Sequence, residues 1–395
     1  MSIRRFEFED EDPPWKLAPT AFEDFTLLVG VSGVGKTRTL SSLAAACRAG
    51  QGRNSGLYSC RWRIEVDTTA GRLAWTASTA QAPPARSVVT HVSIDLDDDS
   101  GIDVHGDRRP APAFIDELVE NDAGDVLVQR RDGAITLLGS DRLLRMKETE
   151  SVVSLFREEE TIAPLHQALR RVHRSRSASW SFIPHDPRRL AERTQGIETM
   201  EDLRDARLLM AQKAFILQEN FPKQFAEVIE SYRDIFPQVT RIIVGPLSTL
   251  RRGTEEDEHP LGVDLLGVAI AEDGVEGHIL WHEMSAGMRR TLQHLLELAL
   301  APRGTVILVD EYENSMGVNC LDAVTEELLR PQRQLQLIIT SHHPYVINNV
   351  PVDHWRVVTR QGSQVRIVPA SEVPALDTKS RQDTPALLRS PARAS

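Results

Sequence analysis

The residues Gly30–Thr37, with the sequence Gly-Val-Ser-Gly-Val-Gly-Lys-Thr, constrain the fold of this chain more than any other feature. They match the pattern G-x-x-x-x-G-K-[ST], in which glycines let backbone N–H groups turn toward a phosphate. Lys36 adds a positive charge for the β- and γ-phosphates, and the Thr37 hydroxyl is suited to bind Mg²⁺. The apolar run Phe25–Val29 predicts a buried strand before the loop, and Lys36–Ala49 predicts a helix whose positive end faces the phosphates. The sequence therefore predicts binding of ATP and Mg²⁺ by Gly30, Ser32, Gly33, Gly35, Lys36, Thr37 and Arg38.

A second motif, Val306–Asn314, places two carboxylates after an apolar run. The run predicts a buried strand with Asp310 at its carboxyl end, where α/β sheets bind their ligands. Asp310 is predicted to join the Mg²⁺ shell, and Glu311 to polarise the attacking water. An acidic pair at this point is also the ordinary appearance of a solvated strand end. The preceding phosphate-binding loop favours the catalytic interpretation.

Two weaker motifs complete the set of candidate site residues. His342 follows the apolar run Leu335–Thr340 and is placed to contact a γ-phosphate, although a surface loop explains it equally well. Ser285 and Gly287 precede the amphipathic segment Ser285–Leu300, and a plain helix N-cap explains Ser285 without any ligand.

The order of these four motifs resembles that of the ABC-class ATPases. Within that class, the chain resembles the branch of stand-alone ATPases. This branch contains the OLD-family ATPases and related anti-phage ATPases, including PARIS- and Septu-like subunits. The chromosome-maintenance and DNA-repair ATPases are more distant. Met284–Gly287 resembles the signature loop of the class, and Asp310–Ser315 resembles its D-E-P-E-N-S segment. Tyr312, Ala286 and His343 depart from the usual residues of the branch.

This resemblance implies an active site shared between chains. In the class, the signature loop binds the γ-phosphate held by a second protomer, so Ser285 and Gly287 would act on the ATP of another copy. The class also has a Q-loop glutamine, for which Lys147–Ser151 is the nearest neighbourhood, with Glu148 or Glu150 as substitutes.

The sequence predicts an α/β fold: an ABC-type P-loop ATPase head with an antiparallel β subdomain and a helical insertion. Turns at Ala70-Gly71 and Asp132-Gly133 predict two β-hairpins, and Ile162–His173 and Met200–Tyr232 have helical spacing. A strand is expected over Val88–Leu96. The expected divisions are an N-terminal lobe over residues 1–150, a helical insertion over 151–236, a C-terminal lobe over 237–370 and a disordered tail over 371–395.

Composition limits the classes of partner. The net charge of −11 excludes a uniformly basic nucleic-acid surface, but it permits a local basic patch. Such a run is present near His173 and His185, and it is either a solvated face or a contact for nucleic acid or an acidic partner. It consists of Arg170, Arg171, Arg174, Arg176, Arg188 and Arg189. The chain has no apolar run long enough for a membrane span and no signal peptide, so a cytoplasmic location without membrane contact is expected.

Three functions fit these features. The first is an ATPase that forms a homodimer or higher homo-oligomer on ATP and acts as a sensor or scaffold in anti-phage defence. It would control a separate nuclease or toxin, with nucleic acid or a phage protein as trigger. Only about fifty residues follow His342, too few for the nuclease domain of the OLD enzymes. The second is a DNA-repair or chromosome-maintenance ATPase that clamps DNA, against which the acidic balance argues. The third is a module that binds ATP without turnover, against which Glu311 argues.

Overall fold

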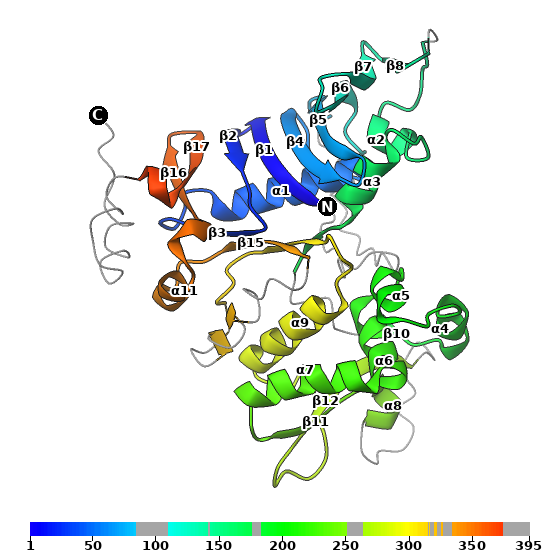
Figure 1. Ribbon diagram of the computed structural model, residues 1–395, viewed down its shortest axis with the longest axis vertical. Helices are drawn as coiled ribbons and strands as arrows, with labels where there is room; N and C mark the ends of the chain where they lie inside the picture. The colour runs from blue at the N-terminus through cyan, green and yellow to red at the C-terminus, as the bar shows by residue number, and fades with distance from the viewer. Residues whose placement is uncertain are drawn as a thin grey trace.

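One large sheet forms the upper lobe of the chain in the computed structural model (Figure 1). Among the described residues it has 13 strands, in the order β8-β7-β6-β5-β4-β1-β2-β17-β16-β3-β15-β14-β9. The structure describes residues 1–83, 110–140, 143–175, 183–250, 264–314, 316, 320, 321, 325, 326 and 334–373. The strands are β1 Ser2–Glu11, β2 Pro14–Ala21, β3 Phe25–Val29, β4 Cys60–Thr68, β5 Gly71–Thr79, β6 Phe114–Asn121, β7 Val126–Arg131, β8 Ala134–Leu137, β9 Val172–Arg174, β14 Val306–Val309, β15 Gln336–Thr340, β16 Trp355–Gln361 and β17 Gln364–Pro369.

The functional half of this sheet is parallel. Strands β9, β14, β15, β3 and β16 run parallel to one another, and the next pair, β16 with β17, is antiparallel. Strands β3, β14 and β15 are buried along their whole length, as expected for parallel strands that are covered on both faces. Their carboxyl ends therefore meet at one edge of the sheet, where the predicted site residues follow them.

The other half of the sheet is antiparallel and contains both predicted hairpins. Strands β4 and β5 pair around Ala70-Gly71, and β7 and β8 pair around Asp132-Gly133. Asp132 has a φ of 51° and Gly133 a φ of 72°, the left-handed conformations that a tight hairpin turn requires. The predicted hairpins and the α/β fold class with an antiparallel β subdomain are confirmed.

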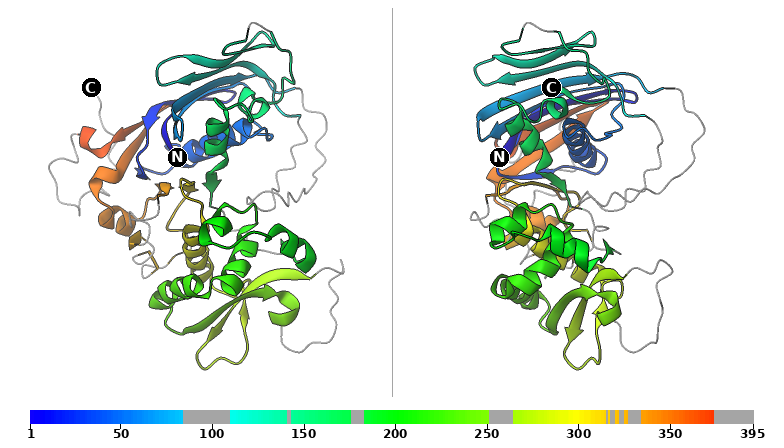
Figure 2. Two further views of the ribbon diagram at one scale, coloured as in Figure 1. Left: turned by 45° about the vertical axis from the view of Figure 1, so that its right-hand side comes forward. Right: turned by 90° about the vertical axis from the view of Figure 1, so that its right-hand side faces the viewer.

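The lower lobe packs helices over a second, smaller sheet (Figure 2). Strand β12 pairs with β10, β11 and β13, and α6, α7 and α9 share a buried apolar core with β11 and β12. The strands are β10 Ile183–Pro184, β11 Val239–Pro246, β12 Leu265–Glu272 and β13 Ile279–Leu280. The helices are α4 Pro187–Arg193, α5 Met200–Asp205, α6 Met210–Asn220, α7 Pro222–Ile235, α8 Leu247–Leu250 and α9 Ala286–Leu300.

Helices of the upper lobe cover the sheet on both faces. Helices α1, α2 and α3 bury one core with the antiparallel strands, and α11 buries another against the parallel strands. Their bounds are α1 Lys36–Gly50, α2 Val152–Leu155, α3 Ala163–Arg170 and α11 Pro344–Asn349, with 3₁₀ turns at Val352–His354 and Ala370–Glu372. Among the described residues, no helix is both long and apolar enough to cross a membrane.

The helical predictions for the middle of the chain are partly wrong. The segment Met200–Tyr232 is divided among α5, α6 and α7, and Pro222 begins α7 because proline is favoured in the first helical turn. The predicted helix Ile162–His173 ends at Arg170, and Val172–Arg174 forms β9 beside β14. The main-chain pairing of Val172–Arg174 with β14 outweighs the helical preference of the local sequence. The predicted strand Val88–Leu96 lies outside the described residues, and the four predicted divisions of the chain remain predictions.

Candidate functional site

A cavity of about 510 Å³ opens at the carboxyl edge of the parallel strands. It is lined by Gly33, Gly35, Lys36 and Thr37 of the loop after β3, together with Glu311, Thr340 and His342 from the ends of β14 and β15. Ser32 and Arg38 line it as well. The fold thus brings residues predicted from three of the four motifs to one place.

The glycines of the loop are required by its geometry. A Cβ at Gly30 would lie 2.6 Å from the carbonyl oxygen of Val358 on the neighbouring strand β16, which is closer than real contacts allow. Gly33 has a φ of +83°, and Gly35, which precedes α1, has a φ of +104°. Side chains with a Cβ strongly disfavour such conformations, so the tight turn from β3 into α1 depends on glycine.

Lys36 lies inside this turn. Its Nζ donates to the carbonyl oxygen of Gly30 at 2.7 Å and to that of Val31 at 3.0 Å. Burial lowers the pKa of Lys36, while the nearby carboxylates of Glu313, Asp310 and Glu311 act in the opposite direction. The ammonium group is therefore held at the mouth of the loop, close to these carboxylates. A bound phosphate would interact with the ammonium group beside the carboxylates or in their place.

Asp310 forms the centre of a polar cluster at the ends of three strands and a helix. Its Oδ1 accepts from the Thr37 hydroxyl at 3.1 Å and from the Thr340 hydroxyl at 2.8 Å. Its Oδ2 accepts from Arg174 at 3.2 Å. An adjacent hydroxyl and carboxylate are oxygen donors of the kind that Mg²⁺ binds beside nucleotide phosphates. The residues present therefore fit the predicted Mg²⁺ ligands, Thr37 and Asp310.

Glu311 is held in an unusual backbone conformation at the end of β14. Its φ is 46°, in the left-handed region that non-glycine residues rarely occupy. Its N–H donates to the Thr340 hydroxyl at 2.7 Å, and its carbonyl oxygen accepts from the N–H of Asn314. These bonds fix the turn that directs the exposed Glu311 side chain to the cavity. Such strain is typical of functional sites.

The two histidines after β15 have different roles. His342 lines the cavity, and both its N–H and its Nδ1 lie within 2.9 Å of the buried Glu313 carboxylate. His343 instead accepts the N–H of Tyr345 with its Nδ1 and caps α11. His342 therefore lines the cavity and His343 does not, and the predicted contact of His342 with a γ-phosphate remains a prediction. The structure adds Glu313, which orients the His342 ring.

Arg174 is a member of the basic run, and the structure places it in the polar cluster around Asp310, which its sequence context does not predict. It lies at the end of β9, beside the strand of Asp310, and also donates to the Ser41 hydroxyl at 3.0 Å. Glu150 instead accepts the Ser154 hydroxyl at 2.8 Å, and neither Glu148 nor Glu150 lines the cavity. The Q-loop residue that the resemblance implies near Lys147–Ser151 remains a prediction.

Ser285 and Gly287 do not reach this cavity. Ser285 is the N-cap of α9, and its hydroxyl accepts the N–H of Met288 at 3.2 Å. Ser285 is exposed, and neither residue lines the cavity around Gly30–Thr37 of the same chain. The helix-cap role is therefore present within one chain, and a role on the nucleotide of another chain remains a prediction.

The hydroxyl of Thr340 offers a test of how this cluster is positioned. Thr340 is 1% exposed and binds both Glu311 and Asp310. Thr340→Val keeps the shape but leaves the Glu311 N–H unpaired, a loss of about 1–3 kcal/mol. We expect ATP turnover to fall about tenfold to a hundredfold while ATP affinity changes less than about threefold. Steady-state phosphate release and calorimetric titration measure the two effects.

A matched control is Thr291→Val on α9. Thr291 is also fully buried, and its hydroxyl has no hydrogen-bond partner among the residues that the structure describes. It should leave turnover unchanged. Equal losses in the two variants would show that Thr340 acts only through packing.

Comparison with known proteins adds a family and a set of similar folds. A family model described as "AAA domain, putative AbiEii toxin, Type IV TA system" matches residues 85–348, more than half of the chain. The match includes Ser285, Asp310 and His342 and begins after the Gly30–Thr37 loop. No curated protein matches the sequence.

Solved structures similar to this chain include three heads of SMC proteins. An SMC head bound to the C-winged helix domain of ScpA is 13% identical, with a TM-score of 0.46, over 93% of this chain and 98% of that chain. The SMC head domain from Thermotoga maritima is 10% identical, with a TM-score of 0.39, over 94% and 99%. A head with an extended coiled coil, bound to the C-terminal domain of ScpA derived from Pyrococcus furiosus, is 12% identical, with a TM-score of 0.41, over 93% and 95%.

Proposed function

The chain belongs to this AAA-domain family, and we propose that it binds Mg-ATP in the Gly30–Thr37 loop and hydrolyses the ATP with Glu311. The main support for the proposal is that Lys36, Thr37 and Glu311 line one cavity, and that the Thr37 hydroxyl bonds the Asp310 carboxylate beside it. Loop, hydroxyl and carboxylates are the parts that P-loop ATPases use to hold phosphates and to position water. Mg²⁺, when bound, would neutralise charge on the β- and γ-phosphates.

Each side chain then has a definite task. Lys36 binds the phosphates, and Thr37 and Asp310 supply oxygen ligands. Glu311 orients a water molecule and accepts its proton as the water attacks the γ-phosphorus and ADP leaves. His342, held by Glu313, contacts the γ-phosphate and distinguishes ATP from ADP. The strained backbone at Glu311 supports this role because it aims the carboxylate at the cavity.

The signature loop is proposed to complete the site from another copy of the chain. Ser285 and Gly287 lie outside the cavity of their own chain, and Ser285 is exposed at the positive end of α9. In a homodimer that places this helix end against the γ-phosphate bound by the partner, the positive end of the helix would offset the negative charge of that phosphate. ATP would then form part of the interface between the two chains.

The biological role that we propose is an ATP-dependent sensor or scaffold in anti-phage defence. It would act in the cytoplasm and control a separate toxin or nuclease, with a nucleic acid or phage protein as trigger. The family description, which refers to a toxin–antitoxin system, supports this role. A DNA-clamping role in repair or chromosome maintenance is disfavoured by the net charge of −11.

Phosphate release and mass measurement on the purified chain test the proposed function. With ATP and Mg²⁺, the wild-type chain should release phosphate, and removal of Mg²⁺ by chelation should stop the release. Light scattering should show a larger assembly with ATP than with ADP. A chain that binds no ATP under these conditions would contradict the proposal.

A further inference from the structure

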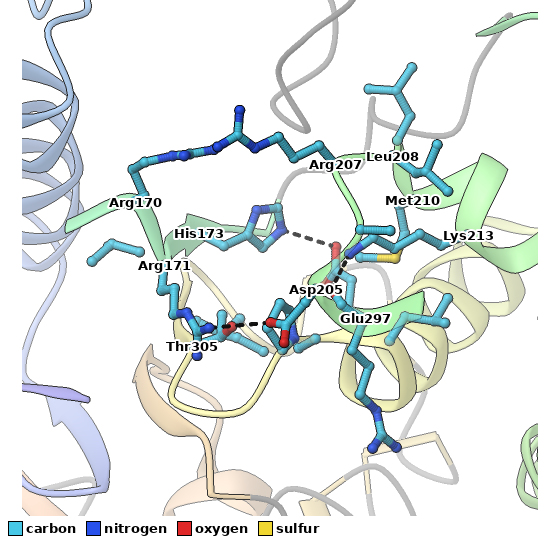
Figure 3. A pocket seen from close by; sticks show the side chains of 18 of the residues that line it. Arg170, Arg171, His173, Asp205, Arg207, Leu208, Met210, Lys213, Glu297 and Thr305 are labelled. Carbon is cyan, nitrogen blue, oxygen red and sulfur yellow. Dashed lines mark hydrogen bonds and ion pairs between the residues drawn. The ribbon is translucent and has the colours of Figure 1, made fainter. Parts of the chain in front are cut away.

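A second cavity, of about 430 Å³, lies between the two lobes and, within the described part of the chain, shares no lining residue with the nucleotide cavity. Figure 3 shows its side chains from close by. The cavity is bounded by the end of α3 and by β9 on one side, and by α9 and the segment between α5 and α6 on the other. Most of the charged side chains lining it are arginines, among them Arg170, Arg171, Arg174, Arg193, Arg204 and Arg207. Among the described residues, Asp205 and Glu297 are the only carboxylates that line it.

Both of these carboxylates are already engaged. Asp205 forms an ion pair with Arg171 at 3.2 Å. Glu297 is fully buried, and although burial alone would raise its pKa, hydrogen bonds from His173 and His294 outweigh that effect and hold the pKa well below the usual range. Neither carboxylate is therefore available to neutralise the remaining arginines.

The exposed arginines face one another across the cavity. Figure 3 shows the Arg170 and Arg207 side chains extending toward each other. Neither guanidinium has an acidic partner among the residues that the structure describes. The pKa of Arg170 is lowered by burial and by the positive charges of Arg207 and Arg53. The pKa of His166 on α3 is lowered to about 4, by burial first and then by Arg170. The region around Arg170 and Arg207 is therefore net positive, although Arg171, Arg174 and Arg204 have acidic partners.

We propose that this cavity binds a small molecule bearing two or more adjacent phosphate groups, with Arg170 and Arg207 as its main contacts. Guanidinium groups match phosphate oxygens in geometry and charge. The volume lies in the range of small-molecule sites. The cavity also has an apolar wall that includes Leu208, Met210 and Leu300, where the uncharged part of such a ligand would pack.

The shape of the basic region favours a small ligand over a nucleic acid. Arg188 and Arg189, which the sequence places in the same basic run, do not line the cavity, and Arg176 lies outside the described residues. The arginines thus converge on a concave site and do not form the extended basic track that a nucleic-acid backbone needs. The net charge of −11 also favours a small ligand over a nucleic acid.

Inorganic tripolyphosphate is the probe for this site. Calorimetric titration of the Lys36→Ala chain isolates the second cavity from the nucleotide loop and should show one tripolyphosphate per chain. In that background, Arg170→Ala and Arg207→Ala should each weaken binding about tenfold or more, and the double variant about a hundredfold. The matched control Arg233→Ala, an exposed arginine on α7, should leave the affinity unchanged.

Thermal unfolding separates loss of binding from loss of folding. Without the probe, Arg207→Ala should be at least as stable as the wild type, because it removes a like charge. Tripolyphosphate should raise the melting temperature of the Lys36→Ala chain, and it should not raise that of the same chain carrying both arginine substitutions. The proposal would be overturned by unchanged affinity in the double variant. It would also be overturned by binding of a 20-nucleotide single strand or duplex that tripolyphosphate fails to displace, because the arginines would then be a nucleic-acid contact.

Discussion

Glu311→Gln is expected to slow ATP turnover at least about a hundredfold, the usual scale for loss of a general base. The amide has the same shape but cannot accept the proton of the attacking water. ATP binding should persist, because Lys36, Thr37 and Asp310 are unchanged and the backbone bond from residue 311 to Thr340 does not involve the side chain. The variant should therefore accumulate the ATP-bound assembly. Phosphate release and light scattering on the same samples measure both effects.

The control for this variant is Glu227→Gln. Glu227 is an exposed carboxylate on α7 in the lower lobe, away from the cavity. It should release phosphate at the wild-type rate. If Glu311→Gln matched that rate, the base would have to be sought elsewhere, and Glu313 would be the nearest alternative.

Lys36→Ala is expected to remove measurable ATP binding. The substitution deletes the charge that pairs with the β- and γ-phosphates and leaves Asp310, Glu311 and Glu313 to repel them. Charge-assisted contacts contribute about 1.5–3 kcal/mol each, so the affinity should fall at least about a hundredfold. Calorimetric titration with Mg-ATP measures the loss.

Stability should change little in this variant, because Lys36 lies in an open loop and its removal creates no sealed cavity. Lys223→Ala on α7, an exposed lysine, is the matched control. Unchanged ATP affinity in Lys36→Ala, with normal melting, would contradict the assignment of the loop.

The nucleotide loop and the acidic strand end could be predicted from sequence because their chemistry is local. In Gly30–Thr37, glycines, lysine and hydroxyl are adjacent in the chain, and Asp310 directly follows its buried strand. A parallel sheet then brings these loop ends to one edge, so the meeting of Thr37 with Asp310 follows from the fold class.

The supporting residues could not be predicted because they depend on long-range pairing. Arg174 contacts Asp310 across 136 residues of chain, and this requires that Val172–Arg174 be a strand beside β14. Its local sequence has helical spacing, so no periodicity indicates the strand. Thr340 is a similar case, because its hydroxyl can reach Asp310 only when β15 pairs with β14.

The basic run illustrates the same limit. From sequence it was either a solvated face or a contact for an anionic partner. The fold separates its members, placing Arg170 and Arg171 in the cavity between the lobes and Arg188 and Arg189 outside it. Arg207 joins them from the segment between α5 and α6, which no local sequence pattern associates with α3.

The central claim is that ATP is bound between two copies of the chain and hydrolysed there. Ser285→Arg should be inactive alone, because bulk and charge block the γ-phosphate position on the partner. Lys36→Ala should also be inactive alone. A dimer containing one of each has one composite site in which an intact loop faces an intact signature, so the mixture should recover part of the wild-type phosphate release.

The measurement is phosphate release from a titration of one variant with the other, with mixed assemblies verified by two affinity tags. The account predicts activity that rises with the fraction of mixed dimers. Absence of any recovery in a sample shown to contain mixed assemblies would contradict it and leave Ser285 as a helix cap alone.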